Sequence, residues 1–265
     1  MKRLLLIACS IIISVAALAQ NQDKPAADTT APKHRIGLVN EYKIKPGMMT
    51  EFLAWAKKEA LPLFIKAGIK ESYFFTNVYG DRDTVAVSEI HDNFAAIKAR
   101  NEAFAKNNTP EALAALTAGG NRYIEHTRTF VVEAMPELSW VNPKLKSLPP
   151  YFSLTIQHVA PFRGRDYEAF IKDDWLPLVK KADTNGRVAN RMRSGGDPNQ
   201  YSTFVPLNDL TDLDQPSKIT QMIGAENAAK IQQKLMGIVL QTETRILRLR
   251  TDISILPAQN LAEKK

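Results

Sequence analysis

Three arginines alternate along one short segment of the sequence, GRVANRMRS. Successive side chains of a β-strand point to opposite faces, so Arg187, Arg191 and Arg193 share one face, and Val188 and Met192 share the other. We expect the apolar face to pack against helices, which turns the arginines toward the interior of the fold. Guanidinium groups bind carboxylate and phosphate in bidentate fashion. The pattern therefore predicts that these arginines line one wall of a cavity that binds a small anionic ligand. A solvated edge strand with arginines paired to Asp and Glu is the alternative.

Two further side chains complete the predicted ligand site. Arg248 alternates with leucines in the strand-like run RILRLR near the end of the chain. His158 alternates with Leu154 and Ile156 in another strand-like run, FSLTIQHVA. A hydrogen-bonded histidine in the core or at the rim of a pocket fits this spacing better than a metal ligand. We expect both side chains near the arginine wall.

Other site chemistry has little support in the sequence. The histidines are His34, His91, His126 and His158, and none lies four residues from another. The sequence has no H-E-x-x-H, G-x-S-x-G, Walker or G-x-G-x-x-G motif. We therefore expect no metal and no cofactor, and the sequence assigns no catalytic residue.

The first 19 residues have the pattern of a cleaved signal peptide. A basic MKR precedes the apolar run LLLIACSIIISVAAL, and Ala17–Ala19 supplies small residues before Gln20. The run is shorter than the roughly 20 residues of a spanning helix, so we expect no membrane span after cleavage. Export to the periplasm or the extracellular space follows, with a lipoprotein processed at Cys9 as a minor alternative. Residues 20–35 and 257–265 are expected to be a spacer and a tail.

Composition excludes some partners and leaves others open. The formal net charge is +7, yet no run of five Lys or Arg occurs, so the sequence does not predict nucleic-acid binding. The only cysteine, Cys9, lies in the signal segment. A mature chain without disulfides must be stabilised by its core or by forming a homo-oligomer.

Two segments of the sequence match at an offset of 115 residues. LPLFIKAG begins at Leu61 and LPLVKKAD begins at Leu176, and their flanks agree as well. Phe52 matches Tyr167, and Trp55 matches Phe170. Because the matching segments occur in the same order, we predict a duplicated module, at 36–140 and 151–256, joined by a Pro-rich linker at 141–150.

Each predicted module has the order β-α-β-β-α-β. In the first, Pro62 should kink a helix or begin a new turn, and Gly68 should follow its end. Thr109 is expected to cap a later helix that has Pro110 at its first position. This order is that of the ferredoxin-like split βαβ fold. We therefore predict an α+β protein of two tandem ferredoxin-like repeats, packed sheet to sheet as an α+β barrel pseudo-dimer around a shared interior.

The doubled half, with YKIKPGMMTEFLAWAKK after its first strand, resembles the dimeric α+β barrel superfamily. Its NIPSNAP-like and antibiotic-biosynthesis-monooxygenase-like branches are the most similar. The resemblance spans both predicted repeats and implies a range of activities: cofactor-free monooxygenases, haem-degrading enzymes, isomerases and binding proteins. Haem-degrading members carry an Asn, a Trp and a His, of which Asn40 alone has a clear counterpart here. The resemblance therefore does not favour haem degradation.

Two functions from different classes remain. The first is binding of a small anionic or amphipathic molecule in a cavity between the two halves. The second is a cofactor-independent monooxygenase or isomerase acting on an aromatic or polyketide-like substrate. An acid–base pair facing a deep apolar pocket would favour the enzyme. The sequence does not place these side chains relative to one another, so it leaves open whether the protein is an enzyme.

Overall fold

The structure is a computed structural model that describes residues 35–257. The expected signal peptide, Cys9, most of the spacer and most of the tail lie outside the described residues. The first half of the described chain contains β1 (Ile36–Ile44), α1 (Met49–Trp55), a π-helical segment η1 (Ala56–Ala60), α2 (Leu61–Lys66), β2 (Ser72–Tyr79), β3 (Thr84–His91), α3 (Phe94–Asn107), α4 (Pro110–Tyr123) and β4 (Ile124–Ala134).

The second half has the same order of strands and helices. A connection with η2 (Pro136–Leu138) and β5 (Trp140–Val141) leads into it. It contains β6 (Tyr151–Val159), α5 (Gly164–Ala169), a π-helical segment η3 (Phe170–Trp175), α6 (Leu176–Lys181), β7 (Gly186–Ser194), β8 (Gln200–Leu207), η4 (Leu210–Leu213), α7 (Lys218–Ile223), α8 (Ala225–Gln233) and β9 (Val239–Leu249). That the halves are tandem ferredoxin-like repeats stays a prediction.

Local signals in the sequence explain where the helices begin and change pitch. The Thr109 hydroxyl accepts a hydrogen bond from the Ala112 amide at 3.3 Å, which confirms the expected cap of α4. Pro62 lies in the first turn of α2, directly after η1, and Pro177 lies at the same place after η3. A proline ring clashes with the carbonyl four residues earlier, so the helix widens just before it.

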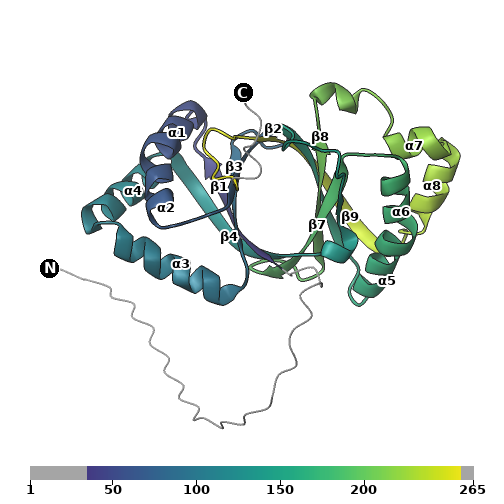
Figure 1. Ribbon diagram of the computed structural model, residues 1–265, viewed down its shortest axis with the longest axis horizontal. Helices are drawn as coiled ribbons and strands as arrows, with labels where there is room; N and C mark the ends of the chain where they lie inside the picture. The colour runs from purple at the N-terminus through teal and green to yellow at the C-terminus, as the bar shows by residue number, and fades with distance from the viewer. Residues whose placement is uncertain (1–34, 258–265) are drawn as a thin grey trace, which may run out of the picture. The chain divides into compact units, whose positions relative to one another are not determined.

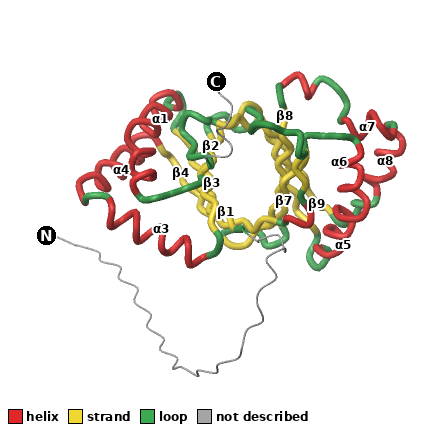
Figure 2. The backbone as a smooth tube through the Cα atoms, viewed as in Figure 1, coloured by secondary structure: helices red, strands yellow, loops and turns green. Residues whose placement is uncertain are grey.

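The strands form one closed antiparallel barrel of eight strands. Their order is β4-β1-β3-β2-β9-β6-β8-β7, and β4 pairs with β7 to complete the ring. The two halves meet edge to edge, with Phe75 opposite Leu249 at one junction and Glu133 opposite Arg191 at the other. In Figures 1 and 2 the helices lie outside the ring, α1–α4 on one side and α5–α8 on the other.

The predicted packing of two sheets face to face is therefore wrong. Edge strands present unpaired N–H and C=O groups, and pairing each edge with an edge of the other half satisfies these groups. A barrel leaves one face of every strand toward its interior and the other toward the helices. The sequence pattern of a strand is the same in both arrangements, which is why the sequence did not distinguish them.

Each half is completed by a segment that follows the other half. Ile255, beyond β9, forms a bridge with Ser72 on β2, with hydrogen bonds of 2.7 and 2.9 Å. In the same way Trp140 of β5, beyond β4, pairs with Arg187 on β7. These crossing segments tie the halves together at the outer face of the barrel.

The barrel interior contains an apolar cluster and a charged network. The cluster is formed by Phe75, Phe152, Leu154, Leu247 and Leu249.

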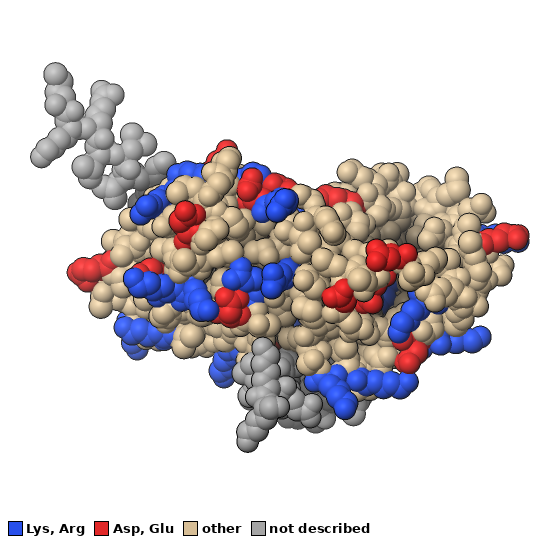
Figure 3. All heavy atoms as spheres, turned by 90° about the horizontal axis from the view of Figure 1, so that it is seen from above, with Lys and Arg blue, Asp and Glu red and all other residues tan. Residues whose placement is uncertain are grey.

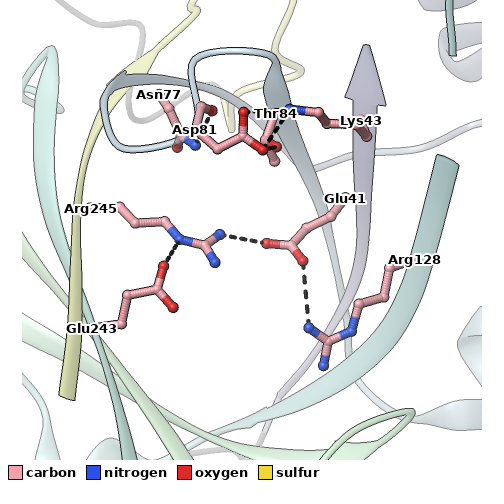
Figure 4. Close-up of polar contacts among 8 residues, drawn as sticks. All are labelled: Glu41, Lys43, Asn77, Asp81, Thr84, Arg128, Glu243 and Arg245. Atoms are coloured by element: carbon pink, nitrogen blue, oxygen red, sulfur yellow. Dashed lines mark hydrogen bonds and ion pairs between the residues drawn. The ribbon is translucent and has the colours of Figure 1, made fainter. Parts of the chain in front are cut away.

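The charged network links the halves across the interior. Arg245 on β9 donates to Glu41 on β1 at 3.0 Å and to Glu243 at 2.5 Å. The other Glu41 oxygen lies 3.8 Å from Arg128 on β4. Figure 4 shows Glu41 between the two arginines, with all three side chains pointing into the barrel. Since the Glu41 side chain is only 18% exposed, solvent screens these ion pairs little.

Glu41→Gln should lower the free energy of unfolding by about 1–3 kcal/mol, because the partly buried Arg245 loses one of its two carboxylates and the exposed Arg128 loses its ion pair. Urea unfolding monitored by circular dichroism measures the change. The matched control is Glu102→Gln on α3, which breaks an exposed pair with Lys98 and should change stability by less than about 0.5 kcal/mol. Equal losses for the two variants would contradict a stabilising role of the network.

Candidate functional site

The arginines predicted as a ligand wall lie on the face opposite to the expected one. Arg187 is 4% exposed and donates to the Thr203 hydroxyl at 2.9 Å, beneath the helices of the second half. Its neighbour Ala189 belongs to the core between sheet and helices. Val188 is opposite Phe204, a side chain of the barrel interior. The predicted face is therefore wrong, because the barrel interior is itself apolar and also accepts Val188.

Arg191 is part of an ion-pair network. It lies 3.3 Å from Glu133 on β4 and 3.5 Å from Glu168 on α5. Glu168 also accepts a hydrogen bond of 2.6 Å from the Tyr201 hydroxyl. Burial, followed by the contact with Glu168, raises the pKa of Tyr201 above its ordinary value. This arrangement matches the alternative in which the arginines pair with acidic side chains.

The other predicted site residues do not join Arg187 and Arg191. Arg193 and Arg248 are exposed. His158 belongs to another strand, β6, and its Nδ1 lies 3.1 Å from a carboxylate oxygen of Asp197. The five residues are thus not gathered at one place, and a role in ligand binding stays a prediction for each of them.

A cavity of about 210 Å³ lies in the first half, between the outer face of the sheet and the helices. Aromatic and aliphatic side chains form most of its wall. The lining residues are Asn40, Tyr42, Phe52, Trp55, Ala56, Ala60, Leu61, Phe64, Ser72, Phe74, Val87, Glu89, Leu116, Gly120, Ile124, Ile253 and Ile255. Ile253 and Ile255 belong to the segment that crosses from the second half.

At two positions of the cavity lining, a small residue stands where the second half has a large one. Ala60 lines it, and the residue 115 positions later is Trp175. Ser72 also lines it, and its counterpart is the buried Arg187. In the second half Trp175 packs against the core and Arg187 lies buried beneath the helices. The two halves therefore have the same order of elements but differ in the size of the side chains at these two positions beneath their helices.

One end of the cavity has a buried carboxylate. Glu89 on β3 is fully buried, and Arg100 on α3 donates to its two oxygens at 2.7 and 2.5 Å. The Arg100 guanidinium also lies over the rings of Phe64 and Phe104, at 5.3 and 5.0 Å from their centroids. A carboxylate oxygen has more than one acceptor site, so Glu89 retains capacity for a donor from a ligand.

Tyr42 and Asn40 add polar atoms to the cavity wall. Burial, helped by the nearby Glu89, raises the pKa of Tyr42 to about 12. Its hydroxyl is therefore neutral at pH 7 and acts as a hydrogen-bond donor or acceptor. Asn40 accepts a hydrogen bond from the Thr129 hydroxyl at 2.7 Å, which fixes the orientation of its amide group.

His91 stands behind Glu89 at the end of β3. Its side chain is 10% exposed, and Nε2 lies 3.6 Å from a Glu89 oxygen, beyond hydrogen-bond distance. This nitrogen is buried without a hydrogen-bond partner among residues 35–257. Burial is the main cause that lowers the pKa of His91, so the imidazole is neutral at pH 7.

Sequence reasoning missed Glu89 and Arg100. A signal was present: Glu89 continues the alternation of Val85 and Val87, so a charged residue occupies an apolar position of a strand. Such a buried charge needs a partner, and Arg100 provides it. Asn40 was singled out only because of the family resemblance, and this residue lines the cavity.

Other kinds of site have less support in the described part of the chain. No group of three or more His, Cys, Asp and Glu side chains within 35–257 is arranged to hold a metal ion. Among the same residues, no helix has the length and apolar character needed to cross a bilayer. On the face shown in Figure 3, basic and acidic side chains are interspersed.

Comparison with known proteins shows the fold. No protein-family model and no curated protein matches the sequence. An anthrone oxidase-like protein is 12% identical over 86% of this chain and 97% of its own, with a TM-score of 0.56. A candidate monooxygenase of Fusobacterium nucleatum is 14% identical over 81% and 92%, with a TM-score of 0.54. A mutant chlorite dismutase of Candidatus Nitrospira defluvii is 11% identical over 82% and 92%, at 0.51.

These structures confirm the resemblance stated from the sequence. The chain has the fold of the dimeric α+β barrel superfamily. At such identities the likeness concerns the fold alone, and function must be argued from the site.

His91 should make stability depend on pH in a defined window. Its pKa is lowered below the ordinary 6.5 in the folded protein, so the unfolded chain binds the proton first as pH falls. Its contribution is fully present above pH 6.5 and is lost as pH falls from 6.5 to the folded-state pKa. Urea unfolding at pH 7.5 and 5.5 should show a smaller loss for His91→Gln than for the wild type. The exposed His126, changed to Gln, is the control and should keep the wild-type loss. A His91→Gln loss equal to that of the wild type would contradict this assignment.

Proposed function

We propose that the protein binds a small, mainly apolar molecule in the first-half cavity, with a hydrogen-bond donor of the ligand directed at Glu89. The observation that carries this proposal is the contrast between the halves. Ala60 and Ser72 line a cavity under the first helices, whereas their counterparts in the second half are the partly buried Trp175, which packs against the core, and the buried Arg187. An apolar cavity with a few polar atoms at one end is the usual form of a small-molecule site.

The proposed ligand site lies in a different place from the one expected from the sequence, and it accepts a narrower range of ligands. The cavity lies beneath the helices of one half, whereas the sequence had placed it between the halves. Apolar walls favour a ligand with a ring or a branched chain. Glu89 carries a negative charge that its pair with Arg100 offsets, so an added ligand anion would not be attracted there. Of the two ligand types expected from the sequence, the amphipathic one fits this cavity.

Three probes of one shape test the chemistry of the cavity: 1-naphthol, naphthalene and 1-naphthoate. Isothermal titration calorimetry should show 1-naphthol binding roughly tenfold more tightly than naphthalene, because a hydrogen bond to a charged group contributes about 1.5–3 kcal/mol. 1-Naphthoate should bind more weakly than either. Ala60→Leu should weaken 1-naphthol binding by about tenfold or more while retaining the wild-type Tm, because leucine fills apolar space.

The matched control for this test is Ala99→Leu. Ala99 is exposed on α3 and does not line the cavity, so this variant should bind 1-naphthol like the wild type. Failure of all three probes to bind at millimolar concentration, or equal weakening by Ala60→Leu and Ala99→Leu, would refute the proposal.

The second candidate function is a cofactor-independent monooxygenase or isomerase that acts on an aromatic or polyketide-like substrate in the same cavity. The neutral His91 favours it: this side chain does not line the cavity but stands behind Glu89, which does, and an imidazole near a carboxylate is suited to move a proton. Anthrone, which occurs in the name of one structural neighbour, is a suitable substrate to try. Oxygen uptake with anthrone that is lost in His91→Phe would support the enzyme, and uptake at the buffer rate would support binding alone.

The two halves are, in this proposal, tandem ferredoxin-like repeats that act as a pseudo-dimer. The same order of elements supports it, as does a repeated contact. The Lys45 amide donates to the Tyr123 carbonyl at 2.9 Å, and 115 residues later the Ala160 amide donates to the Ile238 carbonyl at 2.7 Å.

Export of the protein is also proposed, to the periplasm or the extracellular space. The support is the basic, apolar and small-residue order of residues 1–19. Intact mass spectrometry of protein recovered from the producing cells should show a chain that starts at Gln20. A chain that starts at Met1, or at a lipidated Cys9, would contradict cleavage after Ala19.

A further inference from the structure

One end of the second half carries three exposed apolar side chains. Phe162, in the turn after β6, is 100% exposed, and Met236 and Leu240 are 77% and 66% exposed. We call these three residues the apolar tip. Met236 lies in the turn before β9 and Leu240 near the start of β9. Both are adjacent to the turn of Phe162, because the Ala160 amide donates to the Ile238 carbonyl and Val159 pairs with Val239.

The first half provides an internal control for the apolar tip. At the offset of 115 residues, Phe162 corresponds to Gly47, Met236 to Asn121 and Leu240 to Glu125. All three counterparts are exposed. The same turns of the same fold thus form with polar residues or glycine, so the fold does not require apolar side chains at these places.

The backbone at Phe162 adds a second, independent observation. Its φ is +66°, in the left-handed region that glycine adopts readily, and Gly47 has φ +78° at the corresponding place. A bulky side chain is strained in this conformation. Phe162 therefore combines backbone strain with a fully exposed ring, and neither stabilises the folded chain alone. Strain of this kind concentrates at places that contact a ligand or partner.

Basic side chains border the apolar tip. Arg163 and Arg165 follow Phe162, where the first half has Met48 and Thr50. Arg163 pairs with Asp166 on α5, so Arg165 supplies the net positive charge beside the tip. The formal net charge is +7 for the whole sequence, and +5 once Lys2 and Arg3 leave with the proposed signal peptide. Apolar side chains that protrude beside arginines suit the interface of an anionic lipid bilayer, where the rings enter the acyl boundary and the guanidinium groups meet the headgroups.

We propose that the apolar tip, with Arg163 and Arg165, docks the protein on the surface of anionic lipid membranes. A stable protein interface uses roughly 20–30 residues on each side. Three side chains, two in turns and one near the start of β9, provide far less than that, whereas insertion into a bilayer needs only protruding apolar groups. The proposal is independent of the ligand cavity, which lies in the other half.

Co-sedimentation with lipid vesicles tests the proposal, with one set of pure phosphatidylcholine and one containing phosphatidylglycerol. The wild type should bind the anionic vesicles, and binding should fall as salt is raised. The variant Phe162→Gly, Met236→Asn, Leu240→Glu installs the residues of the first half and should reduce binding by at least tenfold. Arg165→Thr should reduce it less. The wild type and all variants are prepared with the same first residue, so that a difference at the N-terminus does not affect the comparison.

Two controls make the outcome decisive. Ile65→Gln removes an exposed apolar side chain from α2, far from the tip in sequence, and should bind vesicles like the wild type. The triple variant should keep the wild-type Tm, which excludes misfolding as the cause of lost binding, and Phe162→Gly alone should keep or raise it. Absence of wild-type binding, or equal binding by the triple variant, would overturn the proposal. A wild-type dimer that the triple variant converts to a monomer, without vesicle binding, would assign the tip to a second copy and also overturn it.

Discussion

The pairing of sheet edges is the constraint on which the rest of the structure depends. Each half supplies four strands, and its two outer strands would otherwise expose unpaired N–H and C=O groups. Hydrogen bonding of β2 to β9 and of β4 to β7 removes all four edges and closes the barrel. Closure then fixes which face of each strand lies inside. It brings Glu41 and Arg245, which are far apart in sequence, into one ion pair within the barrel. It also leaves the outer faces to the helices, where the cavity lies.

The two halves have the same order of helices and strands but different side chains at corresponding positions. Beneath the helices of the first half, Ala60 and Ser72 leave room, and the buried Glu89–Arg100 pair supplies polarity at the end of that space. Beneath those of the second half, Trp175 packs in the core and Arg187 is buried. At the outer turns the asymmetry is reversed, with glycine and polar residues in the first half and exposed apolar residues in the second. Most of the residues packed beneath the helices of each half belong to that half, so such exchanges alter mainly the core in which they occur.

The candidate site was predicted only in part. Alternation correctly placed Arg187 and Arg191 on one face of a strand, but the choice of face was wrong. That choice assumed that the apolar face meets the helices. In this barrel both faces of β7 are largely covered, since Ala189 packs toward the helices while Val188 lies opposite Phe204 of the interior. Glu89 was detectable as a charge in an apolar alternation. Its partner Arg100 was not, because their contact depends on how α3 lies across the sheet.

The sequence by itself determined the elements and their order. Helix starts such as Thr109 and the widened turns before Pro62 and Pro177 depend on residues within a few positions, so local chemistry suffices to predict them. The repeated order and the family resemblance follow from the same local patterns. Only the tertiary structure decided that the two sheets join at their edges, which faces are buried, and where a cavity is left. These features depend on contacts between residues far apart in the chain, such as Ser72 with Ile255. A pattern within a few neighbouring residues does not contain that information.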